Sequence, residues 1–393
     1  MASMTALFLL LLLGSILSMV QSDGSAGDTK FALKLFGALA KNNSLKNIVF
    51  SPSSIRTSLV LAYLGSEGTT ENELKQTLSL EGADKNEVAK GFAQLLAKGQ
   101  NPQGAQFSYA NRIYVAKRFG LVQSYQELVG KYFNAPAEKV NFEESAKVAQ
   151  EINSWVEEKT HHQIKDLISS STLDSYTVAL LINAIYFKAN WVNPFSLFTT
   201  ILHPFVSSEK KTVRVSTMFQ TEFFKYAELP SLKAKALEMP YKGTDIVFLI
   251  ILPLEEQGLA ELEEKLSGVE LNEICSQLKT EHVRLQLPKF KMEFDVSLNP
   301  VLEQLGLKQM FSENANFKSL VQQTNMHISE VKHKAFIDLN EAGTTAAAAT
   351  YVKGAFLSAN RRKTYPFIVD HPFLFAIKDD QNTFFLGHYT QPK

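Results

Sequence analysis

Few side chains in this sequence stand at spacings typical of a catalytic or metal site. Glu158 and His162 are four residues apart in a segment of helical periodicity, which places two metal ligands on one helix face. No third ligand accompanies them, so a solvated helix face explains the pair better. The run Gly65-Ser66-Glu67-Gly68 lacks the spacing of a nucleophile elbow, and no phosphate-binding glycine loop or Cys and His cluster is present. We therefore expect no catalytic residues, no metal and no cofactor.

The composition of the 393 residues is that of an ordinary globular protein. Hydrophobic residues make up 45% and charged residues 20%, and the formal net charge is +0. A neutral chain has no overall field to attract nucleic acid or an anionic membrane, so we expect neither as a partner. The single cysteine, Cys275, excludes an intrachain disulfide, and its helical apolar spacing indicates a buried structural thiol.

The first residues have the pattern of a secretory signal. Residues 6–20 are almost all apolar, and the small and polar residues 21–25 follow them. The run is too short to span a membrane comfortably, so we predict a signal peptide over 1–22 and a secreted, extracellular protein. A membrane anchor is the alternative, because no Lys or Arg stands near the start. Secretion would open the sequon Asn42-Asn43-Ser44 to glycosylation at Asn42.

Helical and strand-like patterns follow one another in mixed order along the rest of the chain. Ser51 is a suitable N-cap for a helix beginning at Pro52, and Thr70 with Glu73 has the spacing of a capping box. The predicted helices include 148–168 and 259–278, the second with a break near Gly268. The predicted strands include 107–115, 180–189, 246–252, 283–290 and 335–339. This mixed order favours a single α+β domain.

One stretch late in the chain, 341–360, contains a long run of small residues. It begins Glu341-Ala-Gly-Thr-Thr and continues with four alanines. Alanine favours a surface helix. A period of two permits another interpretation, because the alternate positions from Thr344 to Phe356 carry no charge, whereas the other face carries Lys353. That pattern suits a loop that can also enter a sheet as a strand, with Gly343 as its hinge.

Three separated blocks and a C-terminal box resemble the serpins, a family of serine protease inhibitors with a mobile reactive-centre loop. The first block runs from Asn47-Ile-Val-Phe-Ser-Pro-Ser-Ser-Ile to Thr70-Glu-Asn-Glu-Leu. The second is the spacing of Asn183, Trp191-Val-Asn-Pro-Phe, Thr200 and Phe205. The third is the hinge with the run 331–344 that leads into it, and the box is Asp370-His-Pro-Phe. The resemblance covers nearly the whole chain after about residue 29.

This resemblance implies one α+β domain over 29–393, with a large mixed main β-sheet, further sheets and about nine helices. It also implies an exposed reactive-centre loop at about 341–366, and we expect a monomer. In the family a serine protease cleaves the loop and forms an acyl-enzyme. The cut loop then enters the main sheet as a new strand and traps the covalent complex.

The resemblance also assigns roles to individual residues. The hinge residues are Glu341, Gly343, Thr344, Ala346, Ala347, Ala348 and Ala349. The residues of the sheet-opening region are Ser51 and Ser54 beneath the main sheet, Trp191 near its top, and Asn183 and His333 as hydrogen-bonding partners in its centre. Apart from the family, a core Trp, a satisfied core Asn and an exposed His would be expected at the last three positions.

The scissile bond is located by counting from the hinge. In the family the residue before the bond lies sixteen positions after the hinge glutamate, which from Glu341 is Leu357 and gives the bond Leu357–Ser358. Leucine at this position suits an apolar, chymotrypsin-like specificity pocket, and the neighbouring Phe356 would have the same preference.

A count from the other end gives a different bond. The segment between Ser358 and the box is about four residues longer than the family pattern, and loops tolerate such insertions. Counting back from Pro372 places the bond near Arg361 and Arg362, which suits a trypsin-like protease. Two further functions stay open: a non-inhibitory carrier or chaperone of the same fold, and an enzyme or receptor of unrelated mechanism. The small hinge residues favour inhibition, because non-inhibitory members carry bulkier or charged residues there.

Overall fold

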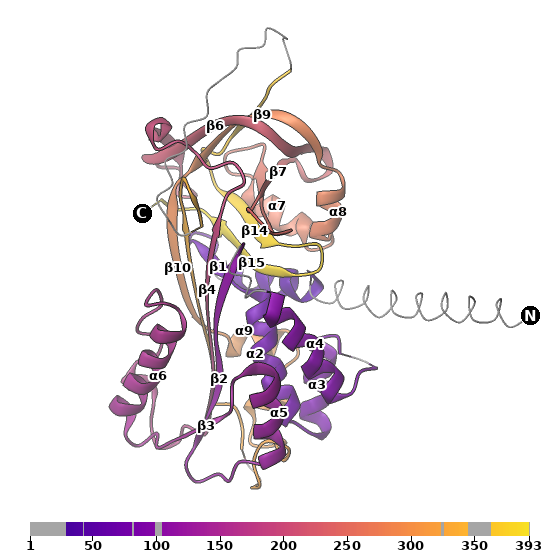
Figure 1. The fold of residues 1–393 in the computed structure, drawn as a ribbon, viewed down its shortest axis with the longest axis vertical. Helices are drawn as coiled ribbons and strands as arrows, with labels where there is room; N and C mark the ends of the chain where they lie inside the picture. Colours follow the sequence, from indigo (N-terminus) through magenta and orange to yellow (C-terminus); the bar gives the residue numbers. More distant parts are fainter. Residues whose placement is uncertain are drawn as a thin grey trace, which may run out of the picture.

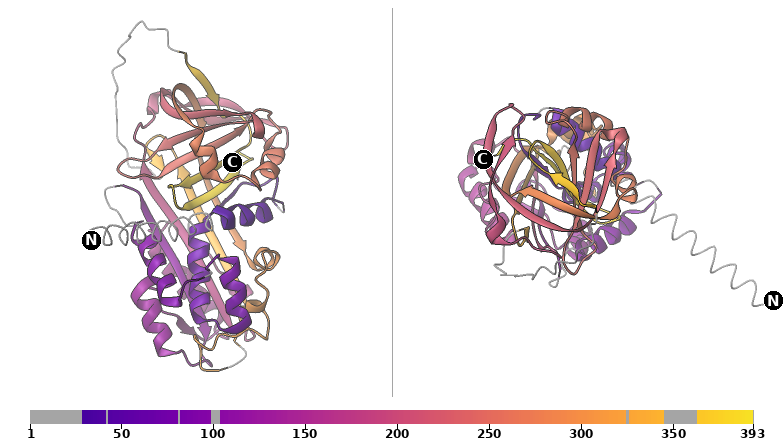
Figure 2. Two further views of the ribbon diagram at one scale, coloured as in Figure 1. Left: turned by 90° about the vertical axis from the view of Figure 1, so that its right-hand side faces the viewer. Right: turned by 90° about the horizontal axis from the view of Figure 1, so that it is seen from above.

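The computed structural model describes residues 29–41, 43–80, 82–98, 104–323, 326–344 and 363–392. The predicted signal peptide, Asn42 and residues 345–362 lie outside the described residues. Within the described part, the molecule is elongated, with most helices at one end and a curved sheet at the other (Figures 1 and 2). None of the helices in that part is long and apolar enough to cross a membrane.

The sheet that concerns the hinge has six strands, and we call it the main sheet. Its order is β10 (Phe290–Ser297), β11 (Glu330–Leu339), β12 (Gly343–Thr344), β4 (Ala179–Asn190), β2 (Gln106–Ala116) and β3 (Glu138–Val140). The pairs β4–β11 and β2–β3 are parallel and the others are antiparallel, so the sheet is mixed. Strand β4 is buried over nearly its whole length, which agrees with its continuous apolar sequence.

A second sheet of nine strands packs across the main sheet at one end of the molecule. Its order is β1 (Ile48–Phe50), β15 (Thr383–Tyr389), β14 (Phe373–Lys378), β8 (Val247–Pro253), β7 (Ala234–Pro240), β6 (Thr212–Leu229), β9 (Lys279–Pro288) and β13 (Tyr365–Ile368), with β5 (Ile201–Val206) also paired to β6. Aromatic rings fill the space between the sheets, as in the contact of Phe187 with Phe385. The main sheet, which contains β12, thus has fewer strands than the second sheet.

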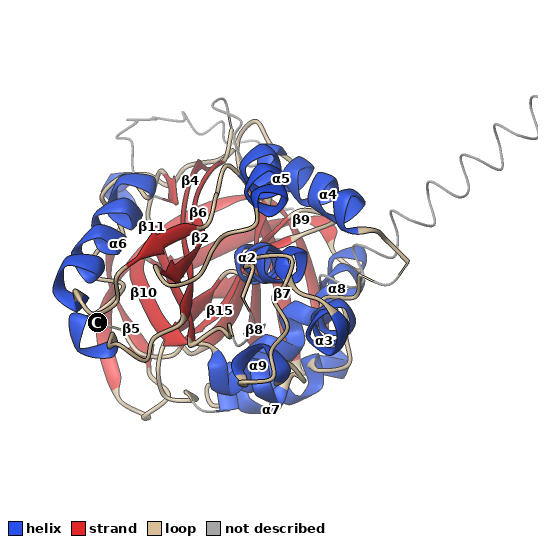
Figure 3. Ribbon diagram, turned by 90° about the horizontal axis from the view of Figure 1, so that it is seen from below, coloured by secondary structure: helices blue, strands red, loops and turns tan. Residues whose placement is uncertain are grey.

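Nine α-helices lie among the described residues. They are 29–41, α2 (Pro52–Gly65), α3 (Gly68–Thr77), α4 (Lys85–Lys98), α5 (Gln123–Phe133), α6 (Ser145–Lys159), α7 (Leu259–Leu266), α8 (Leu271–Ser276) and α9 (Asn299–Gln304). Every residue of α2 is buried, so this helix forms the centre of the core behind the main sheet. Helix α6 covers the opposite face of the sheet (Figures 1 and 3). The structure confirms the predicted α+β fold.

Two local predictions were wrong. The helix expected over 148–168 ends at Lys159, because the backbone at His161 and His162 has positive φ angles of 51° and 61°. Glu158 and His162 therefore do not share a helix face, and His162 instead lies 3.2 Å from Glu157. The spacing of Glu158 and His162 therefore does not form a pair of metal ligands on one helix face.

The capping box at the start of α3 is also absent. The helix begins at Gly68, so Thr70 lies inside its first turn. The Thr70 hydroxyl accepts a hydrogen bond from the backbone of Asn316. The Glu73 carboxylate accepts from the backbone N–H groups of Lys308 and Gln309. Both side chains tie α3 to a distant segment, which their spacing in the sequence does not reveal.

Candidate functional site: the hinge and the strands that receive it

Strand β12 is the first part of the hinge, and it already lies within the main sheet. Strands β4 and β11 pair in parallel from Leu180 with Glu330 to Tyr186 with Phe336. Beyond that point they separate, and β12 occupies the space between them. Thr344 pairs with Leu339 on one side and with Ala189 on the other. The chain reverses tightly after β11, because Asn340 and Gly343 exchange backbone hydrogen bonds of 2.9 and 3.2 Å.

Gly343 is required at its position by close backbone packing. A Cβ atom on residue 343 would lie 2.0 Å from the carbonyl oxygen of Ala189, and the backbone φ is +156°. Any side chain would therefore push β12 away from β4. The hinge glycine allows the close approach on which this pairing depends.

Thr344 points into the core at the junction of the two sheets. It is fully buried, and its hydroxyl oxygen lies 2.6 Å from the hydroxyl oxygen of Tyr241. The Tyr241 ring stacks on Trp191 with a centroid distance of 4.5 Å and an interplanar angle of 14°. Burial raises the pKa of Tyr241, so its hydroxyl stays protonated. The uncharged face of the period-two pattern is thus the face that meets the core at Thr344.

Glu341 holds the base of the hinge through its side chain. Its carboxylate accepts a hydrogen bond of 2.8 Å from the Thr200 hydroxyl and forms a 2.9 Å ion pair with Lys289. Burial by itself would raise the pKa of Glu341, but the Lys289 and Thr200 contacts lower it overall. The group is therefore an ionised carboxylate in a nearly buried site, and it connects the hinge to β5 and to the segment between β9 and β10.

Backbone hydrogen bonds add to this attachment. The Trp191 N–H donates to the Ala342 carbonyl at 2.9 Å, and its indole N–H donates to the Asn340 carbonyl at 3.0 Å. The Phe195 N–H donates to the Glu341 carbonyl at 2.8 Å. The segment that follows β4 therefore holds three successive hinge carbonyls in place.

A buried polar network crosses the centre of the main sheet. Asn111, Asn183 and His333 lie side by side on β2, β4 and β11. His333 Nδ1 contacts Asn183 Oδ1, and the Asn183 amide donates to the Ser54 hydroxyl at 2.7 Å. This network joins the two strands that β12 separates at their other end.

The start of α2 determines which nitrogen of His333 carries the proton. The Ser51 N–H donates to His333 Nε2 at 3.2 Å, so Nε2 is an acceptor and Nδ1 carries the hydrogen that is donated to Asn183. Burial lowers the pKa of His333 to about 3, so the ring is neutral. Ser51 can offer its N–H because it is the N-cap of α2, and its hydroxyl accepts from the Ser54 N–H at 3.1 Å.

The family model for serpins, described as serine protease inhibitors, matches residues 26–392. The chain belongs to the serpin family. It is 36% identical over 363 residues to Serine protease inhibitor 42Dd of Drosophila melanogaster, which covers 91% of this chain and 95% of that protein. It is 33% identical to Antichymotrypsin-2 of Bombyx mori over 92% of this chain and 96% of that protein. The solved structure of Serpin48 from the insect Tenebrio molitor aligns with a TM-score of 0.86 and 33% identity, over 95% of this chain and 99% of that chain.

The structure of this serpin brings together the residues expected in the sheet-opening region. Ser51, Ser54, Asn183 and His333 form one network, and Trp191 lies at the top of the sheet against the hinge. The alanines 346–349, the bond Leu357–Ser358 and the alternatives Phe356, Arg361 and Arg362 lie outside the described residues.

Sequence reasoning missed three residues that hold the hinge of the serpin. Lys289 and Tyr241 contact Glu341 and Thr344 from distant parts of the chain, and Asn340 closes the turn. The residues that neighbour Lys289 and Tyr241 in the sequence do not indicate that these side chains contact the hinge. The alternation of polar and apolar residues in 331–344 indicates that β11 ends near Asn340. It does not indicate which distant residues contact the hinge.

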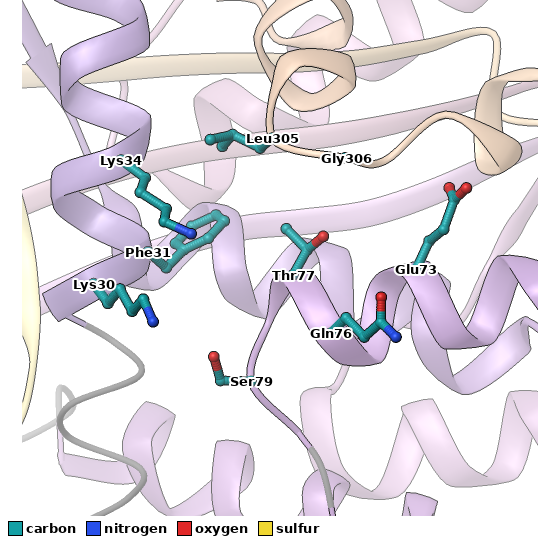
Figure 4. Close-up of a pocket in the computed structure, with 9 residues that line it drawn as sticks. All are labelled: Lys30, Phe31, Lys34, Glu73, Gln76, Thr77, Ser79, Leu305 and Gly306. Atoms are coloured by element: carbon teal, nitrogen blue, oxygen red, sulfur yellow. The ribbon is translucent and has the colours of Figure 1, made fainter.

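The described part of the serpin also has surface pockets away from the hinge. A pocket of about 220 Å³ opens between the first helix, α3 and the turn after α9, and Lys30, Lys34 and Glu73 are among the residues that line it (Figure 4). The Glu73 carboxylate is already bound to two backbone N–H groups. No group of His, Cys, Asp and Glu in the described ranges could hold a metal ion. Burial raises the pKa of the Cys275 thiol to about 12, which disfavours a reactive thiolate.

Proposed function

We propose that this serpin is a secreted inhibitor that acts on its target serine protease as a suicide substrate. The observation that carries the proposal is the position of β12. Gly343 and Thr344 already pair as a strand between β4 and β11, so the site for a longer inserted strand has its first two residues in place. The small residues that follow in the sequence could extend this strand without large side chains entering the core.

The neighbourhood of β12 supports the same conclusion. Extension of the strand toward the centre of the sheet would separate β4 from β11 and break the contact between Asn183 and His333. The strands on either side are long and continuous, so an added strand would gain a ladder of backbone hydrogen bonds along both edges. Those bonds are the source of free energy that insertion after cleavage would release.

We place the cleaved bond at Leu357–Ser358 and the target among chymotrypsin-like proteases, in a covalent complex with a monomeric inhibitor. The count from Glu341 supports this position, and a relative named Antichymotrypsin-2 is 33% identical to the chain. Cleavage near Arg361 by a trypsin-like protease is the alternative. A non-inhibitory role as a carrier or chaperone is the other, and the small residues of the hinge argue against it.

The test is to incubate the protein with chymotrypsin and, separately, with trypsin. Products are separated on a denaturing gel, and the released C-terminal peptide is weighed by mass spectrometry. A denaturant-resistant complex with a peptide beginning at Ser358 supports the proposal. A complex with trypsin and a peptide beginning at Arg362 or Lys363 moves the bond. Cleavage without any complex supports the non-inhibitory alternative.

A further inference from the structure

The segment between β4 and β6 has an unusual surface. The twenty residues 189–208 contain no Asp, Glu, Lys or Arg, whereas charged residues make up 20% of the chain, so about four would be expected. Within this segment, four large apolar side chains are exposed: Leu197 by 56%, Phe198 by 84%, Ile201 by 54% and Leu202 by 55%. We call residues 197–202 the apolar strip. Four exposed apolar residues within six exceed the scattered single ones that need no explanation.

In the apolar strip the polar side chains point inward and the apolar side chains point to solvent, which is the opposite of the usual arrangement in a folded protein. Its two polar residues make the inward contacts: Thr199 donates to the Phe219 carbonyl of β6 at 3.1 Å, and Thr200 donates to Glu341 at 2.8 Å. The Ser196 hydroxyl accepts from the Phe198 N–H and begins a short 3₁₀ turn at Leu197–Thr199. The backbone is therefore held in place while the apolar side chains point to solvent.

The location of the apolar strip connects it to the loop. Glu341, which Thr200 binds, is the hinge residue from which the reactive-centre loop departs. The loop returns at β13, which pairs with β9, and β9 pairs with the same strand β6 that carries β5. The strip and the described residues at both ends of the loop are thus connected through the Thr200–Glu341 hydrogen bond and through the paired strands β5, β6, β9 and β13.

We propose that the apolar strip is a secondary docking surface for the target protease, whose own apolar rim beside the active-site cleft would cover it. This inference rests on the proposed inhibitory function. A specific complex of two proteins buries about 800 Å² on each partner, so surface beside the loop can belong to the interface. The buried core of such interfaces is enriched in aromatic residues and depleted of charged ones, as the apolar strip is.

A second copy of the chain is the competing occupant, and the sequence of β5 argues against it. Among the described strands, β5 pairs only with β6, and on the side away from β6 the Val206 N–H donates to the Asp370 carbonyl at 2.8 Å. Pro204 interrupts that strand and removes one backbone N–H, which is a common protection of edge strands against pairing with another chain. Pro204 therefore disfavours pairing of β5 with a strand of a second copy. It does not hinder contact of a protease with the exposed side chains of the apolar strip.

The test compares the wild-type protein with the double variant Leu197→Ser and Phe198→Ser. The control is Tyr176→Ser, because Tyr176 is 85% exposed and lies before the opposite end of β4. We expect the association rate with chymotrypsin to fall about tenfold in the double variant, since a weaker encounter complex dissociates before acylation. Binding to active-site-inactivated chymotrypsin should weaken by a similar factor. The stoichiometry of inhibition and the thermal midpoint should stay unchanged, and the control should behave as wild type.

Three outcomes would overturn the docking surface. Equal association rates for the double variant and wild type would show that the strip does not contact the protease. A raised stoichiometry would show that the strip acts through the hinge. Self-association of the wild type by sedimentation, lost in the double variant, would make a second copy the occupant. Absence of any covalent complex with the wild type would contradict the proposed function itself, so the two failures are distinguishable.

Discussion

The hydroxyl groups of Thr344 and Tyr241 lie 2.6 Å apart in a fully buried site, where the hinge enters the main sheet. A buried hydrogen bond between neutral groups contributes about 1 kcal/mol. The pair shows that Thr344 faces the core, and the alternate residues that follow it in the sequence as far as Phe356 are all uncharged. If the proposed inhibitory function holds, this orientation makes the charge and size of the hinge residues decisive for insertion.

Thr344→Arg should convert the protein from an inhibitor into a substrate. The guanidinium would have to enter the space beside Tyr241, and burial of an unpaired charge costs several kcal/mol, roughly 3 or more. Insertion would be delayed relative to hydrolysis of the acyl-enzyme, so the stoichiometry of inhibition should rise several-fold. Thr345→Arg is the matched control, since the period-two pattern assigns it to the other face. An unchanged stoichiometry for Thr344→Arg would contradict the assigned orientation.

Gly343→Ala should weaken the pairing of β12 with β4. The added methyl group would meet the Ala189 carbonyl at 2.0 Å, and we expect a loss of about 1–3 kcal/mol in the free energy of unfolding. Gly91→Ala in α4 is the control, because nothing lies within 4 Å of its added Cβ. That change should stabilise the protein by about 0.5–1 kcal/mol. Urea unfolding of both variants measures the difference, and equal effects would contradict the prediction.

His333→Gln should reduce the dependence of stability on pH. Burial lowers the pKa of His333 to about 3, while an unfolded histidine titrates near about 6.5. Between these values the unfolded chain binds a proton that the folded chain excludes. The contribution of a neutral His333 is therefore complete above about pH 6.5, and it decreases by up to about 1.4 kcal/mol per unit as the pH falls toward 3.

The measurement is the free energy of unfolding of wild type and His333→Gln between about pH 4.5 and 7.5. The advantage of the wild type should shrink as the pH decreases. Burial raises the pKa of Glu341 and the Lys289 contact lowers it, with a lowered pKa as the net result. The stabilising contribution of ionised Glu341 therefore also decreases as the pH falls. Glu341 is present in both proteins, so its contribution cancels in the difference. A difference that does not vary with pH would exclude titration of His333 as the cause.

Leu357→Arg should move the preference from chymotrypsin to trypsin. A basic side chain suits the acidic specificity pocket of trypsin-like proteases and not an apolar one. We expect the association rate with chymotrypsin to fall and that with trypsin to rise, each by roughly 100-fold or more. The companion variant with Arg361→Ala and Arg362→Ala should leave both rates unchanged. The opposite pattern would place the scissile bond at the arginines.

Local features of the hinge and the core could be predicted from the sequence. The N-cap at Ser51 depends on its own hydroxyl and the next three residues, and the structure confirms it. Strand β4 follows from a continuous apolar run and is confirmed near its predicted bounds. Strand β11 is confirmed at its end, Leu339, but it begins at Glu330, five residues before the predicted start. The failures were local patterns with distant partners, such as Thr70, whose hydroxyl binds Asn316 instead of capping α3.

By itself, the sequence determined the alternation of the hinge, the N-cap at Ser51 and the apolar run that forms β4, because each depends on neighbours within a few positions. Only the tertiary structure decided that β12 turns back between β4 and β11, that Lys289 neutralises Glu341, and that Phe198 remains exposed. These features join residues far apart in the chain. Their contacts arise from the packing of the two sheets, and no local spacing of residue types encodes such packing.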